Sequence, residues 1–310
     1  MIVSCGEALI DFLPMSGGDG SRGFRPLPGG SPFNIALAVA RLGVPAGFLA
    51  RLSTDLFGDL LLDCMAENGV DTGLVRRSDE PSTLAFVDVR PGEEPRYAFF
   101  ANGAADRNLA PADLPPALSD AVSCLHLGSN AMAQEPAATT LEGLMRREHG
   151  RRVLSLDPNI RPTLIADAAL YRRRFEGWLG LASLVKLSRA DLAWLYPGAD
   201  PEAIAAGWLA RGPALVVVTR GADGAVAFGR FGKAEVPGTA VSVVDTIGAG
   251  DTFHGALLAW LHRQDRLTPA GLEALDAAAA RDALSLAARA AAINCGRAGM
   301  DPPRAAELGL

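Results

Sequence analysis

The stretch VVDTIGAGDTFHGALLAWL, at 243–261, places small residues directly before an acidic residue and a helical pattern. We expect AVSVVD at 240–245 to form a buried strand and a helix to begin near Thr252, with Gly248-Ala249-Gly250 in the turn between them. Backbone N–H groups in such a turn can converge on an anion, and the helix N-terminus adds partial positive charge. Asp251 can therefore accept a proton from a bound hydroxyl group, or it can serve only as the helix N-cap, a position that Asp favours.

A second glycine-rich stretch, PGGSPFNIALAVARLG at 28–43, also precedes a helical pattern. Gly29 and Gly30 would let the backbone approach a ligand closely. Asn34 falls in the first turn of the helix that Ser31 and Pro32 open, where its amide offers both donors and acceptors. Taken alone, Asn34 could equally be a polar residue at a helix end with no ligand.

Short apolar runs alternate with helical patterns along most of the chain. This alternation predicts a mostly parallel sheet covered by helices on both faces. The stretches TLAFVDVR (83–90) and PRYAFF (95–100), on either side of a turn at 91–94, predict an antiparallel hairpin. With the irregular stretch 12–28, this hairpin is expected to form a small β lid. The other expected strands are 2–6, 152–157, 184–188, 214–219 and 240–245, and the expected helices are 32–42, 59–68, 135–149, 168–182, 201–210 and 281–294.

The composition excludes several classes of protein. The chain has 310 residues, of which 49 % are hydrophobic and 21 % charged, as in ordinary globular proteins. The formal net charge of −6 argues against nucleic acid or an anionic membrane as the main partner. The four cysteines form no CxxC pair, which disfavours a zinc site. Because no long apolar run lacks a charge and the N-terminus has no basic leader, we expect a cytoplasmic protein without a membrane span.

Both glycine-rich stretches resemble signatures of a known family. DTIGAGD at 245–251 resembles the C-terminal signature of the PfkB carbohydrate kinases, the ribokinase-like sugar kinases, and 28–43 resembles their N-terminal signature. Two signatures in the right order are far more specific than either one alone. Within the family, GEALIDFLP, DPNIRP and KLSRADLAWL look most like bacterial fructokinases. Further matches, which extend the resemblance over essentially the whole chain, are GEALIDF (6–12), STDLFGDLL (53–61), LDPNIRP (156–162), VKLS (185–188) and VVVTRGADGAV (216–226).

The resemblance implies a fold and an activity. The fold would be α/β, a ribokinase-like three-layer α/β/α architecture with a mostly parallel central sheet and a small β-sheet lid. It would form a single kinase domain over 1–310, with the lid formed from about 12–28 and 83–106. The implied activity is ATP-dependent, Mg²⁺-requiring transfer of the γ-phosphoryl group to a hydroxyl of a ketohexose, with fructose as the expected sugar. A homodimer formed through the lid is a further expectation.

The same resemblance assigns the reacting groups. Asp251 would be the general base that accepts the hydroxyl proton. The backbone N–H groups of Gly248, Ala249, Gly250 and Asp251 would form an anion hole for the transferring phosphoryl group. A carboxylate at a helix N-terminus is favoured in its ionised form. We therefore expect Asp251 to be available as a proton acceptor at neutral pH.

Residues near both ends of the chain would hold the sugar. Asp11 is expected to accept from vicinal sugar hydroxyls, and Gly29, Gly30 and Asn34 to lie against the sugar beneath the lid. Two further substrate-binding residues are expected, Phe99 on the lid hairpin and Arg161 in DPNIRP. An aromatic residue on a strand is usually a packing residue, so the alternative is that Phe99 packs within the lid and does not contact the sugar.

The nucleotide would be bound by the C-terminal half of the chain. Thr219, Gly221 and Gly224 look like the family's TxGxxG turn at the ATP phosphates. Asn159, Lys186 and Ser188 are also expected at ATP, and Asn294, on the Ala-rich helix, at the border of the adenine.

The expected ions and the departures from the family pattern concern a few positions. Where many relatives carry N-x-x-E, this chain has Ser188-Arg189-Ala190-Asp191, and Asp191 is expected to reach Mg²⁺ through a water molecule. K⁺ is expected at Asp245 and Ile247, beside the loop at 298–299. His254 stands where Asn is common, and we expect it to pack or to form a hydrogen bond and not to take part in catalysis.

Two kinds of alternative function remain. One is another kinase of the family, acting on 2-keto-3-deoxygluconate, ribose or a nucleoside. The lid stretch FANGAAD at 100–106 lacks the arginine-bearing motif that we associate with the 2-keto-3-deoxygluconate kinases. The other is a non-catalytic sugar- or nucleotide-binding protein, because a fold does not fix a function. Asp251 argues against this class, since a protein that only binds has no need of a general base.

Overall fold

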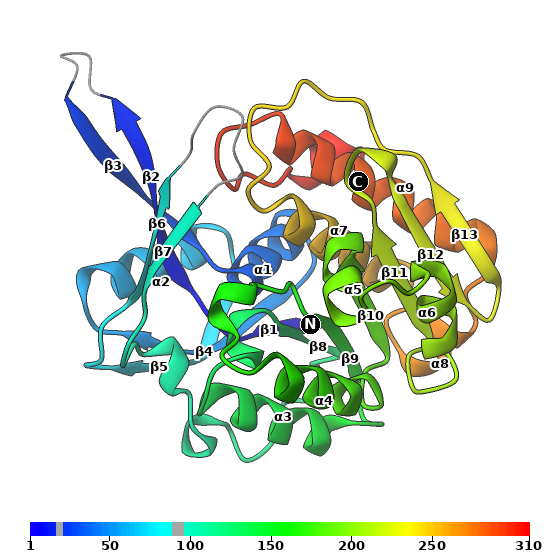
Figure 1. The fold of residues 1–310 in the computed structure, drawn as a ribbon, viewed down its shortest axis with the longest axis horizontal. Coiled ribbons are helices and arrows are strands. Elements are labelled where there is room, and N and C mark those ends of the chain that lie inside the picture. The colour runs from blue at the N-terminus through cyan, green and yellow to red at the C-terminus, as the bar shows by residue number, and fades with distance from the viewer. Residues whose placement is uncertain (17–20, 89–95) are drawn as a thin grey trace.

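A large twisted sheet with helices on both faces forms the body of the molecule (Figure 1). The computed structural model describes residues 1–16, 21–88 and 96–310. The strand order is β13-β12-β11-β10-β9-β8-β1-β4-β5, and all neighbours from β11 to β5 pair in parallel, whereas β11–β12 and β12–β13 are antiparallel. The strands are β1 (Ile2–Cys5), β4 (Ala46–Ser53), β5 (Asp71–Ser78), β8 (Cys124–Gly128), β9 (Val153–Asp157), β10 (Leu184–Ser188), β11 (Leu215–Thr219), β12 (Ala225–Gly229) and β13 (Gly232–Val236). The predicted mostly parallel sheet is confirmed.

The helices divide between two apolar cores, one on each face of the sheet. Strand β11 shows why, because Leu215 and Val217 belong to one core while Val216 and Val218 belong to the other. A strand buried on both faces needs a continuous apolar run. One core contains residues of α1 (Ser31–Arg41), α2 (Leu56–Glu67), α7 (Ala249–Arg263), α8 (Pro269–Glu273) and α9 (Ala277–Cys295). The other contains residues of α3 (Ala137–Glu148), α4 (Ala168–Leu179), α5 (Arg189–Leu195) and α6 (Pro201–Trp208).

A second, smaller sheet projects from the body (Figure 1). Its strand order is β3-β2-β6-β7, with bounds β2 (Leu9–Ser16), β3 (Arg22–Gly29), β6 (Thr83–Asp88) and β7 (Arg96–Phe100). The predicted hairpin pairs antiparallel, and the stretch expected to be irregular forms a second antiparallel hairpin. The turn at 91–94, and 17–20 between β2 and β3, lie outside the described residues. We call this sheet the lid.

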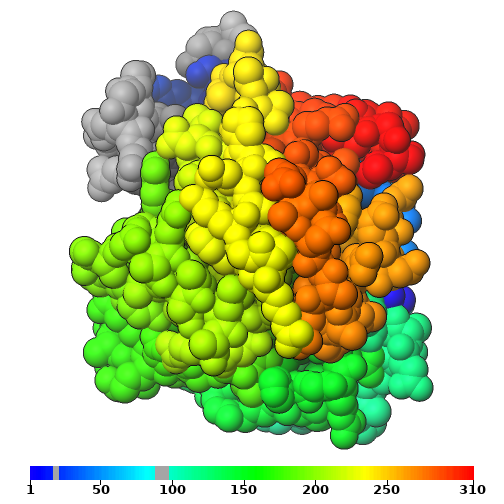
Figure 2. All heavy atoms as spheres, turned by 90° about the vertical axis from the view of Figure 1, so that its right-hand side faces the viewer, coloured from blue at the N-terminus to red at the C-terminus, as the bar shows by residue number. Residues whose placement is uncertain are grey.

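The strand expected at 240–245 does not form, and this prediction was wrong. The segment between β13 and α7 has no regular structure, and its valines are largely exposed, with Val243 at 62 %. Its backbone bonds to the end of α9 instead of to a strand, because the N–H groups of Val244 and Asp245 donate to the carbonyl of Cys295 at 2.8 and 3.2 Å. Figure 2 shows this yellow segment running beside the orange helix α9.

Helix α7 begins at Ala249, three residues before the expected start at Thr252. Among the described residues, no helix is long and apolar enough to cross a membrane.

Candidate active site

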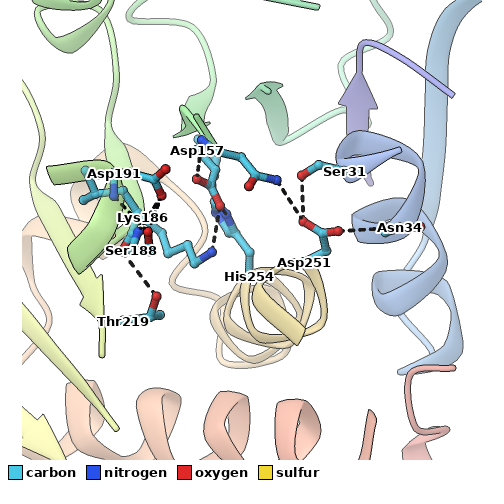
Figure 3. Close-up of polar contacts among 12 residues, drawn as sticks. Ser31, Asn34, Asp157, Lys186, Ser188, Asp191, Thr219, Asp251 and His254 are labelled. Atoms are coloured by element: carbon cyan, nitrogen blue, oxygen red, sulfur yellow. Dashed lines mark hydrogen bonds and ion pairs between the residues drawn. The ribbon is translucent and has the colours of Figure 1, made fainter. Parts of the chain in front are cut away.

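The carboxyl ends of the parallel strands bring the predicted residues to one edge of the central sheet. Asp157 ends β9, Ser188 ends β10 and Thr219 ends β11. Helices α1 and α7 begin at the same edge, and Figure 3 shows their first turns facing each other across Asp251. Ligands of open α/β sheets bind at this edge. The fold therefore collects residues from distant parts of the chain into one candidate site.

Asp251 lies buried in the first turn of α7 and is held by donors from α1 (Figure 3). The Ser31 hydroxyl donates to Asp251 Oδ1 and the Asn34 amide donates to Asp251 Oδ2, each at 2.7 Å. The Asn159 amide approaches Oδ1 at 3.4 Å. Asn159, which we expect at the ATP, thus lies beside Asp251. These donors fix the orientation of the carboxylate.

A glycine explains why the two helices can meet so closely. A Cβ at Gly255 of α7 would lie 2.6 Å from the Cβ of Ala38 on α1 and 3.2 Å from the backbone oxygen of Ile35. The distance to Ala38 is far below van der Waals contact and the distance to Ile35 is tight, so only glycine fits while the helices keep this separation. The close crossing puts the first turns of both helices within hydrogen-bonding distance.

Burial raises the pKa of Asp251, whereas the hydrogen bonds from Asn34 and Ser31 and the charge of Lys186 oppose this rise. The position at a helix N-terminus, taken alone, predicts that the ionised form of Asp251 is favoured. The net direction is the opposite, because desolvation of a buried carboxylate is the larger effect. The neighbouring donors therefore reduce the free-energy cost of ionising the buried Asp251 carboxyl group.

The glycine turn before α7 is as sharp as its sequence predicts. Gly248 has a φ of 69°, in the left-handed region, and a Cβ there would lie 2.8 Å from Met300 Sδ. The Ala249 N–H, expected in the anion hole, instead donates to the carbonyl of Thr246 at 3.2 Å. The first bond of α7 runs from Thr252 N–H to the Gly248 carbonyl at 2.8 Å. An α-helix leaves its first N–H groups without intrahelical partners, so Gly250 and Asp251 supply the amides that can bind an anion.

Asp11 lies on the face of the lid that turns toward the site. Its carboxylate covers Gly29, where a Cβ would lie 2.3 Å from Asp11 Oδ2. The pKa of Asp11 is raised to about 7, mainly because burial disfavours its charged form. The positive charge of Arg161 lowers this pKa and the negative charge of Asp251 raises it, so both groups lie near Asp11. Gly30 is the N-cap of α1, with a φ of 103°.

Phe99 and Arg161, the other two predicted sugar residues, come from the lid strand β7 and from the loop after β9. Phe99 pairs in register with Ala85, and Ala85 pairs with Asp11, so these side chains share one face of the lid. Arg161 Nη1 donates to Asn159 Oδ1 at 2.8 Å. The predicted sugar residues are thus brought together from the lid, α1 and the loop after β9.

A cavity of about 610 Å³ lies between the end of β11 and helix α9. It is formed largely by small and apolar residues, as suits a flat aromatic ring with phosphates at one end. The predicted residues Thr219, Gly221, Gly224, Ala249 and Gly250 line it. The other lining residues are Ala222, Gly238, Thr239, Ala240, Val241, Val243, Thr246, Phe253, Ala288, Ala291, Ala292 and Cys295.

Asn294 does not line this cavity, so the expectation that it borders the adenine gains no support from the structure. It is fully buried, its amide donates to the carbonyl of Ile247 at 2.8 Å, and its amide oxygen accepts from the N–H of Asp301 at 3.0 Å. The neighbouring Ala291, Ala292 and Cys295 face the cavity instead. Asn294 therefore joins the loop before α7 to the loop after α9.

Lys186 and His254 lie beneath the glycine turn. Lys186 Nζ forms a buried ion pair with Asp157 Oδ2 at 2.7 Å and would lie 3.2 Å from a Cβ at Gly250. His254 is fully buried and its Nε2 lies 2.7 Å from Ser155 Oγ, so the expected hydrogen bond is confirmed.

Ser188 and Asp191 form a capping box at the start of α5. Asp191 Oδ2 accepts from the Ser188 hydroxyl at 2.6 Å and from its N–H at 3.0 Å, and Oδ1 accepts from the Ile160 N–H at 2.8 Å. Burial raises the pKa of Asp191, and the charge of Asp157 raises it further. Asp191 thus joins α5 to the loop after β9.

The predicted cation residues form a compact turn. Asp245 Oδ1 accepts from the Ile247 N–H at 3.0 Å, and Oδ2 accepts from the Gly299 N–H at 2.9 Å. The segment before α7 and the loop after α9 are therefore adjacent, as expected. Within residues 1–16, 21–88 and 96–310, no group of three or more His, Cys, Asp or Glu side chains has a metal-binding arrangement.

Sequence reasoning missed two partners in the site. Ser31 was considered only as a helix opener, although it stands next to Gly29 and Gly30 in the same motif. Asp157 was read only as part of DPNIRP, although a charged residue at the end of a buried strand is a usable signal. The α9 residues that line the cavity could not be identified from the sequence, because alanines on a helix usually indicate packing.

The whole chain matches known proteins. A model of the pfkB family of carbohydrate kinases matches residues 1–306. A fructokinase of Rhizobium leguminosarum bv. trifolii is 42 % identical over 282 residues, which cover 91 % of this chain and 86 % of the relative. Among solved structures, a fructokinase with bound ATP from Xylella fastidiosa is 32 % identical, with a TM-score of 0.91 over 99 % of this chain and 96 % of that one. A Vibrio cholerae O395 fructokinase in a fructose, ADP and calcium ion bound form is 27 % identical, with a TM-score of 0.85 and coverage of 99 % and 97 %. The protein described here therefore belongs to the pfkB family of carbohydrate kinases and has the ribokinase-like α/β fold of that family.

Proposed function

We propose that this protein transfers the γ-phosphoryl group of ATP to a hydroxyl of fructose. The observation that carries the proposal is the position of Asp251. Its buried carboxylate lies near the sugar-side residues Asp11 and Asn34, and the adjacent Gly250 lines the β11–α9 cavity. The fructokinases named above, one with ATP and one with fructose and ADP, support the choice of both substrates.

In this proposal Asp251 accepts the proton of the attacking hydroxyl. The O–H bond of the sugar breaks as its oxygen bonds to the γ-phosphorus, and the bond from that phosphorus to the bridging oxygen of ADP breaks. The Gly250 and Asp251 amides stabilise negative charge on the transferring oxygens. Gly248 shapes the turn. The Ala249 N–H can join the anion hole only if its hydrogen bond to the Thr246 carbonyl breaks.

The remaining predicted residues divide between the two substrates. Asp11 and Asn34 bind sugar hydroxyls, Gly29 and Gly30 allow the sugar to approach the backbone, and Phe99 and Arg161 flank it. Thr219, Gly221 and Gly224 bind the ATP phosphates together with Lys186. The single-domain organisation over 1–310 is part of the same proposal.

Asp191 fits an indirect role at Mg²⁺. A carboxylate has about four lone-pair sites, and the Ile160 N–H and the two Ser188 donors occupy three of them. The remaining site can accept from a water of hydrated Mg²⁺, an ion that keeps several waters. The ion supplies positive charge to the phosphates when it is bound.

We also propose that K⁺ binds at Asp245 and Ile247 and orders the turn before α7. Each carboxylate oxygen of Asp245 has one backbone donor and keeps a lone pair. We expect K⁺ to raise kcat, measured by ADP release at constant ionic strength. Equal rates in Na⁺, K⁺ and tetramethylammonium would contradict this role.

The proposed function is tested by ADP release across a panel of sugars, with Asp251→Asn as the key variant. We expect the variant to keep its fold and ATP binding, while kcat falls roughly 10²–10⁴-fold, the usual effect of losing a general base. Near-normal turnover in Asp251→Asn would exclude Asp251 as the base.

The same panel tests the sugar. Because Asp11 would repel a substrate carboxylate, we expect kcat/KM for fructose to exceed that for 2-keto-3-deoxygluconate by at least about tenfold. Asp11→Ala should reduce fructose turnover and leave ATP affinity almost unchanged. A preference for the keto-deoxy acid would overturn the choice of sugar while leaving the kinase assignment intact.

A further inference from the structure

A chain of buried polar side chains runs beneath the glycine turn, through β8, β9 and α7 to β10. It begins at His126, whose Nδ1 lies 3.4 Å from Ser155 Oγ, and continues from Ser155 Oγ to His254 Nε2 at 2.7 Å. His254 Nδ1 lies 3.6 Å from Asp157 Oδ2, and the same oxygen accepts from Lys186 Nζ at 2.7 Å. All of these residues are at most 4 % exposed. We call them the buried polar chain.

Lys186, at one end of the buried polar chain, determines which atom carries each of its hydrogens. An ammonium group can only donate, so Asp157 is an ionised acceptor. His254 Nδ1 has no other partner within the described residues, and a bare lone pair there would face the carboxylate. His254 Nδ1 therefore carries the hydrogen, and His254 Nε2 accepts from the Ser155 hydroxyl.

The same reasoning extends to the far end of the chain. Ser155 has one hydrogen and gives it to His254, so its oxygen accepts from His126 Nδ1. His126 Nε2 is then a bare acceptor, and it has no partner in the described part of the chain. Every donor in the chain thus points toward Asp157.

The pKa directions agree with neutral imidazoles. Burial lowers the pKa of His254, although Asp157 opposes this, and burial together with His254 lowers that of His126 well below its usual value. Burial opposes ionisation of Asp157, but Lys186 and His254 outweigh it and hold its pKa well below the usual range. The single buried negative charge of Asp157 is therefore balanced by the single positive charge of Lys186.

A buried ion pair of this kind is a poor way to gain stability, because removing two charges from water costs more than a hydrophobic pair would. Its location suggests another use. Lys186 Nζ lies directly beneath Gly250, one of the amides available for an anion, and Asp157 accepts only one of its three hydrogens.

We propose that the buried polar chain positions the Lys186 ammonium to contact the transferring phosphoryl group, with His254 as a positioning residue that acts through Asp157. This inference rests on the proposed kinase function. Lys186 supplies positive charge where negative charge develops, and His254 keeps Asp157, and through it Lys186, in one orientation.

The tautomer of His254 tests the chain directly in the unmodified protein. The sequence has only four histidines, so ¹⁵N-resolved NMR of the imidazoles is simple, and Gln variants of the surface residues His149 and His262 identify the buried pair. We expect His254 as the neutral Nδ1–H tautomer, unchanged between about pH 6 and 8. An Nε2–H tautomer or an imidazolium would overturn the proposal.

The pair His254→Asn and His254→Leu tests the consequence for turnover. Asn and Leu have nearly the same shape, but only the Asn amide can place an N–H where His254 Nδ1 stands. We expect His254→Asn to retain at least half of the wild-type kcat and His254→Leu to lose about tenfold, with the KM for the sugar unchanged within about twofold. Equal kcat values for the two variants would refute the positioning role.

A control on the same helix separates this effect from simple loss of stability. Leu257→Ala removes a buried side chain of α7 outside the buried polar chain, and it should lower Tm with little change in kcat. If His254→Leu does not fold, the NMR tautomer decides the question. Failure of this inference is distinct from failure of the proposed function. If only the inference fails, Asp251→Asn still lowers kcat by roughly 10²–10⁴-fold, while His254→Asn and His254→Leu have equal kcat values.

Discussion

Asp251 works in surroundings that oppose its charge. Burial raises its pKa, and the donors from Asn34 and Ser31 lower it again. A general base must be ionised at the working pH, so in the proposed role of Asp251 these hydrogen bonds help to keep the base available near neutrality. Single hydroxyl and amide groups on α1 therefore influence the chemistry of a residue on α7.

At this scale we predict the effect of Ser31→Ala on the pH profile. The substitution removes a donor that lowers the pKa of Asp251, so that pKa rises. Because the active form is the ionised one, the acidic limb of kcat/KM moves to higher pH. A hydrogen bond to a charged group contributes about 1.5–3 kcal/mol, so kcat/KM at pH 6 should fall at least about threefold, with a smaller loss at pH 8.

Ser4→Ala is the matched control for Ser31→Ala. The buried Ser4 hydroxyl donates to the Pro32 carbonyl at 2.7 Å, in the same first turn of α1, but does not contact Asp251. It should leave the pH profile in place. The role of Ser31 would be rejected if both variants had the wild-type profile.

At the scale of elements, the site depends on the close crossing of α1 and α7. The donors to Asp251 come from α1, and their distances hold only while Gly255 lets the two helices touch. The lid strand β3 leads through Gly29 and Gly30 directly into α1. The starts of α1 and α7 thus join the proposed sugar side to the proposed phosphate side.

We predict that Gly255→Ala destabilises the protein by about 1–3 kcal/mol, the usual cost of overpacking. It should also lower kcat, because moving the helices apart lengthens the bonds from Ser31 and Asn34 to Asp251. Chemical denaturation and steady-state kinetics measure the two effects.

Gly143→Ala provides the comparison for Gly255→Ala. Gly143 lies in α3, is exposed, and has no atom within 4 Å of where a Cβ would stand. An exposed helical Gly→Ala change should stabilise by up to about 1 kcal/mol and leave kcat unchanged. Equal stability of the two variants would contradict the tight crossing.

At the scale of the whole molecule, the lid has two different faces. Asp11 and Phe99 share the face toward the site, whereas Phe12, Phe24, Phe86 and Phe100 share the other. On that face Phe86 stacks on Phe12 and contacts Phe24 and Phe100 edge to face. Phe24 is 48 % and Phe100 63 % exposed. Exposed apolar groups gathered in this way mark interaction surfaces, which supports the expectation of a homodimer through the lid.

We predict that the purified protein sediments as a dimer and that Phe100→Glu shifts it toward monomer. A charge in an apolar interface is left unpaired and desolvated, so association weakens. Leu170→Glu, on α4 and also at an exposed position, should leave the dimer intact. A wild-type monomer at all concentrations, or a dimer that Phe100→Glu does not weaken, would disprove this interface.

Much of the architecture could be predicted from the sequence, because the signals are local. Apolar runs such as LVVVT in β11 identify strands buried on both faces, and Gly248 marks a turn that requires a positive φ. The position of Asp251 at a helix start follows from its neighbours in the chain. The glycine motifs and their order were also sufficient to indicate the family, which the comparisons confirm.

Tertiary structure alone decided the contacts that lie far apart in the chain. The valines at 240–245 have the pattern of a strand, but no strand lies beside them, so their backbone bonds to the end of α9. Asn294 has the polarity of a ligand-binding residue, yet the fold places it between two loops. The bond from Ser31 to Asp251 spans 220 residues, and the pKa of Asp251 follows from burial that only the assembled core creates. Local pattern determines which elements form, whereas desolvation and hydrogen-bond partners depend on which elements meet.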